Sequence, residues 1–145
     1  MSTESIQQAS VTLFKNYETF AVHPSLTNGS GAEIFAGQEV FISGDREVSP
    51  RNAGAQIPIG VCIVGAADGD RVSIRSLFYS DLNANAAGAI AAGVLVRPDG
   101  TRDASGRPNY VAAATGELAS GIVIVGTAAA GPLYIGLFKS LIVAP

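Results

Sequence analysis

The chain of 145 residues has few charges for its size. Only 14% of its residues are charged and 48% are apolar, whereas a typical soluble domain carries about 25% charged residues. Since the exterior of a monomer has to be polar, we expect another copy of the chain or a partner protein to cover part of this surface. The net charge of −3 argues against nucleic acid as a partner, because phosphate selects basic faces.

The residue types that carry most catalysis and metal binding are also scarce. His23 is the only histidine, Cys62 is the only cysteine, and tryptophan is absent. A single cysteine excludes an intrachain disulfide, and Cys62 lies in an apolar run where a small buried thiol is the ordinary expectation. Tetrahedral zinc sites need three or four His or Cys ligands. We therefore expect no catalytic residues, no metal and no cofactor, and a protein that is not an enzyme.

Two short acidic loops are the remaining candidates for ion binding. They are Asp68–Asp70 and Asp99–Asp103. Carboxylates in loops can bind calcium, but neither loop has the full ligand pattern, and Asp beside Gly is also typical of a tight turn. The sequence favours the turn.

No membrane-targeting segment is evident. The first ten residues, MSTESIQQAS, have neither the basic start nor the apolar core of a signal peptide. The segment Leu118–Phe138 has no charge over a length that could cross a bilayer. Four glycines and Pro132 interrupt it, however, and the related segment of the first half carries charges. We expect no membrane span.

The sequence repeats itself in two places. Ile34–Arg46, IFAGQEVFISGDR, matches Ile90–Arg102, IAAGVLVRPDGTR, 56 positions later (90 − 34). Gly60–Gly65, GVCIVG, matches Gly121–Gly126, GIVIVG, at a shift of 61 (121 − 60). The second copy therefore has five extra residues between the two matches (61 − 56). The repeats, about 31–78 and 88–143, predict an internally duplicated β module.

Short runs that are apolar, or that alternate between polar and apolar residues, are separated by Gly-rich turns. This pattern predicts an all-β fold, either a small β-barrel or a sandwich. The fold is expected to form a single β domain over residues 31–145. Residues 48–56 are expected to form a polar loop, 79–87 a connector with at most one helical turn, and Pro98-Asp99-Gly100 a turn. The expected strands are Glu39–Ser43, Ile57–Val64, Arg71–Leu77, Val94–Arg97, Asn109–Ala113, Ile122–Val125, Leu133–Phe138 and Leu141–Val143.

Residues 1–30 differ from the rest and are treated as an N-terminal arm. They are polar, with aromatic residues at Phe14, Tyr17 and Phe20. One interpretation is an extended arm that becomes ordered on a neighbouring subunit or on a larger surface through these aromatics. The other is a disordered tail with one edge strand near Thr19–Val22. Both remain open.

Arg46 and Arg102 are the charged positions that both copies keep. They are candidates for a subunit or capsid contact, because arginine forms bidentate pairs with carboxylates. A solvated arginine in a turn is the simpler interpretation and is preferred.

The order of three motifs resembles a known family. Gly88–Val96 (GAIAAGVLV), the turn Pro98-Asp99-Gly100 and Gly121–Gly131 (GIVIVGTAAAG) resemble the small capsid decoration proteins, also called cement or head-stabilising proteins, of tailed bacteriophages. The resemblance covers about residues 31–143. Gly131-Pro132 departs from the Gly-Asp that is common in the family, whereas Gly69-Asp70 of the first copy keeps it.

This resemblance implies a structural virion protein. Such proteins are β-rich and usually homotrimeric, sit on the outer surface of an icosahedral head, and bridge capsomers of the major capsid protein. We therefore expect a capsid decoration protein, made in the host cytoplasm and located on the virion, with neither nucleic acid nor membrane as a partner.

Two other classes of protein are alternatives to a capsid decoration protein. A carbohydrate- or host-surface-binding module of a phage fibre or spike would group exposed aromatics on one face. A lipoyl or biotinyl carrier domain would need a lysine in the connector 79–87, which has none.

Overall fold

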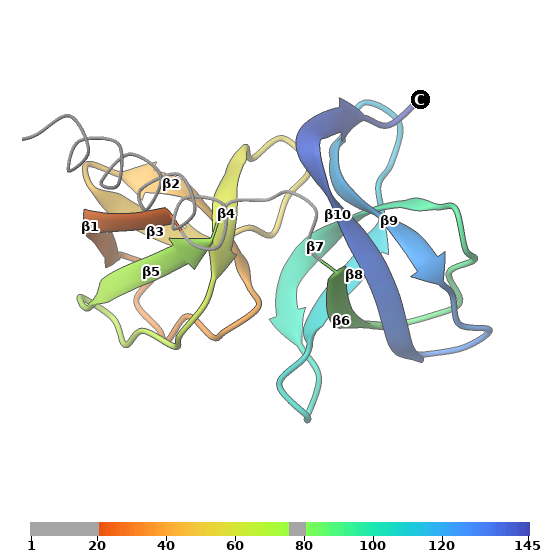
Figure 1. Ribbon diagram of the computed structural model, residues 1–145, viewed down its shortest axis with the longest axis horizontal. Coiled ribbons are helices and arrows are strands. Elements are labelled where there is room, and N and C mark those ends of the chain that lie inside the picture. The colour runs from red at the N-terminus through yellow and green to blue at the C-terminus, as the bar shows by residue number, and fades with distance from the viewer. Residues whose placement is uncertain (1–20, 76–80) are drawn as a thin grey trace, which may run out of the picture.

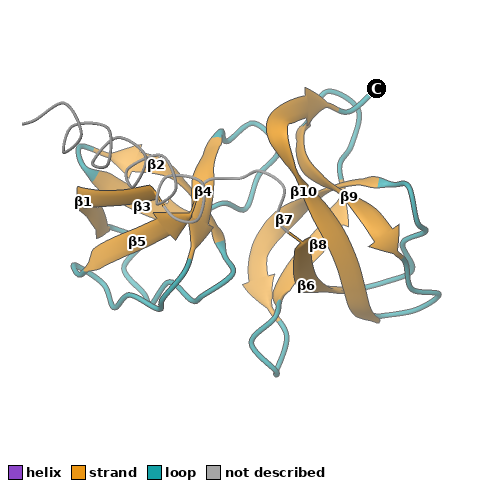
Figure 2. Cartoon of the chain, in the orientation of Figure 1, coloured by secondary structure: helices purple, strands orange, loops and turns teal. Residues whose placement is uncertain are grey.

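Ten strands form two closed five-stranded barrels (Figures 1 and 2). The computed structural model describes residues 21–75 and 81–145, and no helix occurs within those two ranges. The all-β barrel fold predicted from the sequence is thus confirmed. The first barrel contains β1 (Ala21–Asn28), β2 (Glu39–Gly44), β3 (Glu47–Pro50), β4 (Pro58–Cys62) and β5 (Arg71–Arg75). The second contains β6 (Asp81–Ala86), β7 (Leu95–Arg102), β8 (Pro108–Ala112), β9 (Leu118–Val125) and β10 (Gly131–Val143).

The predicted duplication is confirmed by strand order and register. The first barrel has the order β1-β3-β2-β4-β5, and the second repeats it as β6-β8-β7-β9-β10 around a closed sheet. Val40 pairs with Gly60 in the first barrel, as Val96 pairs with Gly121 in the second. The isolated β-bridges are also equivalent in the two barrels, since Ile34 pairs with Ala66 in the first and Ile90 pairs with Thr127 in the second. The paired positions of one barrel therefore have equivalents in the other, apart from the five extra residues and the longer last strand of the second copy.

Each barrel encloses its own small core. Alternate residues of a strand face inward, so β4 and β5 show alternating burial along their length. The first core consists of Leu26, Ile34, Val40, Val48, Cys62, Ala66, Val72 and Ile74. The second consists of Ala84, Ala86, Ile90, Val96, Tyr110, Val123, Leu133, Ile135 and Leu137.

Two segments that were expected to be irregular contain strands. Residues 48–50 of the expected polar loop 48–56 belong to β3, which pairs with β1 and β2 and buries Val48 completely. The connector contains β6 instead of a helical turn. Its Ala84 and Ala86 are fully buried, whereas Asn83 is exposed and Asn85 half-buried, which is a strand alternation. Both predictions were wrong, because closure of the barrel determines these strands more than local propensity does.

Three boundaries also differ from the expectation. β7 continues through the expected turn at residues 98–100 to Arg102, with an irregular register against β8. The two strands expected at the C-terminus are one strand, β10, whose register against β9 shifts between Leu137 and Ile142. Residues 21–28, which were expected to be part of the N-terminal arm, form β1 and belong to the first barrel. Residues 1–20 lie outside the described residues.

Glycines at equivalent positions let strands approach closely in both barrels. A Cβ on Gly60 would lie 2.3 Å from the carbonyl oxygen of Arg75, and one on Gly121 would lie 2.8 Å from that of Gly136. Real Cβ atoms do not approach backbone so closely, so a side chain here forces the strands apart. The glycines that begin both GVCIVG and GIVIVG are therefore required by the barrels.

We predict that Gly121→Ala lowers the free energy of unfolding by about 1–3 kcal/mol, the usual cost of overpacking. Urea unfolding followed by circular dichroism measures it. The matched control is Gly88→Ala, since nothing lies within 4 Å of a Cβ there and its φ is not positive. The control should stay within about 0.5 kcal/mol of the parent. Equal stability of both variants would contradict the steric explanation.

Candidate functional site

A buried carboxylate, that of Glu39, joins the two barrels. Glu39 lies on β2 of the first barrel and is 1% exposed. Its Oε1 accepts a hydrogen bond of 2.6 Å from the Tyr110 hydroxyl on β8, and another from the Ser120 hydroxyl on β9. Both donors belong to the second barrel. A buried carboxylate without donors is strongly unfavourable, so these two hydroxyls hold the barrels at a fixed separation.

Arg51, which follows β3, neutralises the charge of Glu39. Its guanidinium is fully buried, and its Nη1 lies 3.2 Å from Glu39 Oε2. Its Nη2 donates to the backbone carbonyl of Gly54 in the first barrel and to that of Leu118 in the second. The ion pair therefore also bridges the barrels, because a charge of the first barrel binds backbone of the second.

Burial changes the acid–base properties of this cluster. Removal from water raises the pKa of the Glu39 carboxyl above its ordinary value, while hydrogen bonds from Ser120 and Tyr110 and the charge of Arg51 oppose that rise. Burial also raises the pKa of the Tyr110 phenol well above its ordinary value, and the neighbouring Glu39 adds to this effect. Tyr110 therefore stays protonated and remains a donor to Glu39.

Two further hydrogen bonds also cross the junction between the barrels. Gln38 Nε2 donates to the carbonyl of Gly100 at 3.2 Å, and the amide of Leu118 donates to the carbonyl of Gly54 at 3.0 Å. A Cβ on Gly54 would lie 2.3 Å from Cγ of Glu117. The absence of a side chain at Gly54 thus allows its loop to lie directly on the second barrel.

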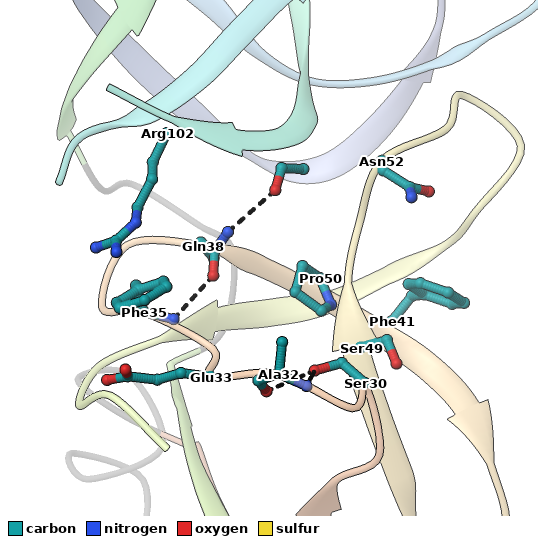
Figure 3. Close-up of a pocket in the computed structure, with 11 residues that line it drawn as sticks. Ser30, Ala32, Glu33, Phe35, Gln38, Phe41, Ser49, Pro50, Asn52 and Arg102 are labelled. Atoms are coloured by element: carbon teal, nitrogen blue, oxygen red, sulfur yellow. Dashed lines mark hydrogen bonds between the residues drawn. The ribbon is translucent and has the colours of Figure 1, made fainter. Parts of the chain in front are cut away.

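A groove with a cavity volume of about 400 Å³ lies beside the junction (Figure 3). The first barrel contributes Phe35 and Gln38, and the second contributes Gly100 and Arg102. The guanidinium carbon of Arg102 lies 3.0 Å from the centroid of the Phe35 ring, which is a cation–π contact. Gln38 Oε1 accepts a hydrogen bond of 2.8 Å from the Phe35 amide, so its side chain is fixed from both ends. The lining also includes Glu33, Phe41, Ser49 and Asn52.

The two arginines shared by the repeats have different surroundings. Arg46 is exposed in the turn between β2 and β3, has a φ of 59°, and its carbonyl accepts a hydrogen bond of 2.9 Å from the Thr27 amide. Arg102 instead stacks on Phe35 of the other barrel. The structure therefore does not bring these two residues together, and their roles as subunit or capsid contacts stay predictions. The other candidate contacts, Phe14, Tyr17 and Phe20, lie outside the described residues.

The remaining candidates for chemistry are involved in local structure. Asp68 accepts a hydrogen bond of 2.9 Å from the Gly31 amide, and Asp99 binds the amide and the hydroxyl of Thr101. Cys62 is buried as predicted, and burial raises the pKa of its thiol. In residues 21–75 and 81–145, no group of three or more His, Cys, Asp or Glu side chains is placed to hold a metal ion.

No helix in the described ranges is long and apolar enough to cross a membrane. Among known proteins, no family model matches the chain, and no curated protein matches it significantly.

No sequence motif predicts the polar residues of the junction. Glu39, Arg51, Tyr110 and Ser120 belong to no motif and are far apart in the sequence, with 81 positions between Glu39 and Ser120. A signal did exist in the repeat. The equivalents of Glu39 and Arg51 in the second copy are Leu95 and Ala113, since the Arg51 amide donates to the Glu39 carbonyl as the Ala113 amide donates to that of Leu95.

This equivalence gives a test of the ion pair. We predict that Glu39→Leu alone lowers the free energy of unfolding by about 3–5 kcal/mol, because the charge of Arg51 is left buried without a partner. Combining Glu39→Leu with Arg51→Ala recreates the apolar pair of the second barrel. The double variant should therefore be more stable than the sum of the single changes by at least about 1 kcal/mol. Urea unfolding of the four proteins measures this coupling, and strictly additive losses would exclude it.

Proposed function

We propose that the protein is a structural virion protein that decorates the outside of a bacteriophage head. It binds the assembled shell and stabilises contacts between capsomers of the major capsid protein. The observation that carries this proposal is a pair of exposed β-branched residues that both barrels present at equivalent positions. They are Ile63 and Val64 in the first barrel, 39% and 62% exposed, and Ile124 and Val125 in the second, 47% and 58% exposed.

Repeated apolar pairs of this kind are suited to a repeating partner. Contiguous exposed apolar residues mark interaction surfaces, and one chain offers the same pair twice. A shell offers identical subunits many times, so each contact can be weak while their sum is large. Binding to the assembled shell and not to free subunits stabilises the shell by mass action. No chemical step is required.

Two further features support the proposal. The low charge of the chain is expected of a protein whose surface is covered by partners. The duplicated barrels span the region over which the motif order resembles that of decoration proteins. That resemblance also supports a homotrimer on the outer capsid surface.

We predict that the purified chain cosediments with undecorated shells assembled from the major capsid protein of the same genome. The double variant Val64→Asp/Val125→Asp should bind the shells at least about tenfold more weakly, because a buried carboxylate has to be desolvated. Val143→Asp is the matched control, since Val143 is 60% exposed but has no equivalent in the first barrel. Failure of the parent chain to bind shells at any tested concentration would refute the proposal.

The N-terminal residues give a second test on the same shells. Deleting residues 1–20 leaves all ten strands in place, so the barrels should unfold at the parent's urea concentration. If Phe14, Tyr17 and Phe20 bind the shell or a neighbouring subunit, occupancy on the shell should fall. Unchanged occupancy in cryo-electron microscopy of saturated shells would remove these three residues from the contact.

A carbohydrate- or host-surface-binding module of a fibre or spike is the second candidate. The groove favours it, because Phe35 and Phe41 lie there beside Glu33, Asn52 and Arg102, and aromatic rings with hydrogen-bonding side chains are the usual elements of a ligand site. Binding on a glycan array that is lost in Phe41→Ala, together with no binding to shells, would favour this function over decoration.

A further inference from the structure

The contact between the two barrels joins two different faces of one duplicated module. We call the side used by the first barrel face A and the side used by the second barrel face B. Since the module occurs twice, the second barrel has its own face A and the first barrel its own face B. Neither of these takes part in the junction. Face A comprises Gln38, Glu39, Pro50 and Arg51, and face B comprises Pro98, Tyr110, Leu118 and Ser120.

Strand register identifies the two free faces. Leu95 and Ala113 are the equivalents of Glu39 and Arg51, as their backbone hydrogen bond shows. Ile42 pairs with Val48 as Pro98 pairs with Tyr110. The free face A of the second barrel is therefore Val94, Leu95, Ala112 and Ala113. Val48, the equivalent of Tyr110, is fully buried in the core of the first barrel, so the free face B of the first barrel consists of Ile42, Ile57 and Ile59.

The free faces differ from the used faces in one consistent way. The used faces contain an amide, a carboxylate, a guanidinium and two hydroxyls, whereas the seven residues of the free faces are apolar, with Arg46, the equivalent of Arg102, as a charged neighbour. Ile42 is 51% and Ile57 66% exposed, and Ala112 is also exposed. Burial of such exposed isoleucines against another chain is favourable, because it removes apolar surface from water.

At the centre of the contact, the polar residues of both used faces are replaced by apolar residues at the equivalent positions of the free faces. Glu39 meets Ser120 within the chain, and the equivalents of these residues on the free faces are Leu95 and Ile59. If the free faces met in the same arrangement, leucine would lie where the carboxylate lies and isoleucine where its hydroxyl donor lies. In that arrangement, apolar contacts would replace the hydrogen bonds of the junction.

We propose that a second copy of the chain docks through face A of its second barrel onto face B of the first barrel. The contact between chains then repeats the contact within each chain. Such head-to-tail interfaces close into rings or extend into filaments, and a homotrimer formed in this way is a ring of six barrels. Docking of this kind does not depend on capsid binding, because it involves only the chain itself.

Mixing two face variants tests the proposal with the purified full-length chain. Ile57→Asp disables face B of the first barrel, and Ala112→Glu disables face A of the second. In sedimentation velocity the parent should be an oligomer and each variant a monomer. Their equimolar mixture should form a dimer with one chain of each, because each variant retains the face that the other lacks. An interface made of the same patch on both subunits cannot give this rescue.

Matched controls separate docking from other effects. Val64→Asp and Ala128→Glu place the same charged residues at an exposed valine and an exposed alanine outside both faces, and should keep the parent's sedimentation coefficient. Circular dichroism checks folding, and Ile42→Asp replaces Ile57→Asp if the latter unfolds. A monomeric parent, oligomeric face variants, or a mixture that stays monomeric would each overturn the proposal. If Val64→Asp loses shell binding but remains an oligomer, the docking proposal is unaffected. The tests of docking and of capsid decoration can therefore fail independently.

Discussion

The hydrogen bonds that Glu39 accepts from Tyr110 and Ser120 are the constraint on which the rest of the structure depends. They connect the carboxylate of one barrel to hydroxyls of the other, and Arg51 supplies the opposite charge. Because hydrogen bonds to a buried charge are directional, they fix rotation as well as distance. The groove, the stacking of Arg102 on Phe35 and the choice of faces left free all follow from this one fixed arrangement.

The fold class was predictable because a duplicated module repeats its pattern of apolar residues. The two shifts, 56 and 61, reappear in the strand registers, where Val40 and Gly60 correspond to Val96 and Gly121. β3 and β6 were not predictable from local pattern. β3 has only four residues, and the alternation of β6 depends on alanines, which also favour a helix. Closure of the barrel decides both.

The junction could not be predicted from motifs, because its polar residues come from strands distant in the sequence and follow no fixed spacing. Comparison of the two copies contained more information than either copy alone. Residues that both copies keep, such as Gly60 and Gly121, serve the barrel itself. Residues that differ, such as Glu39 against Leu95, mark where one barrel contacts a different neighbour from the other. Arg46 and Arg102 show the limit of this rule, since they are identical and yet lie in different surroundings.

The polar junction also has a consequence for how the chain folds. Two similar modules on one chain can pair wrongly, either with the barrels in reversed roles or with a barrel of another nascent chain. In the reversed arrangement Leu95 would meet Ile59, and Glu39 and Arg51 would remain on the outside, exposed to water. When Glu39 instead meets an apolar face, its charge is buried without donors, which is strongly unfavourable. The buried charge of Glu39 therefore favours the second barrel of its own chain, which supplies two hydroxyl donors, over an apolar face of a neighbouring copy.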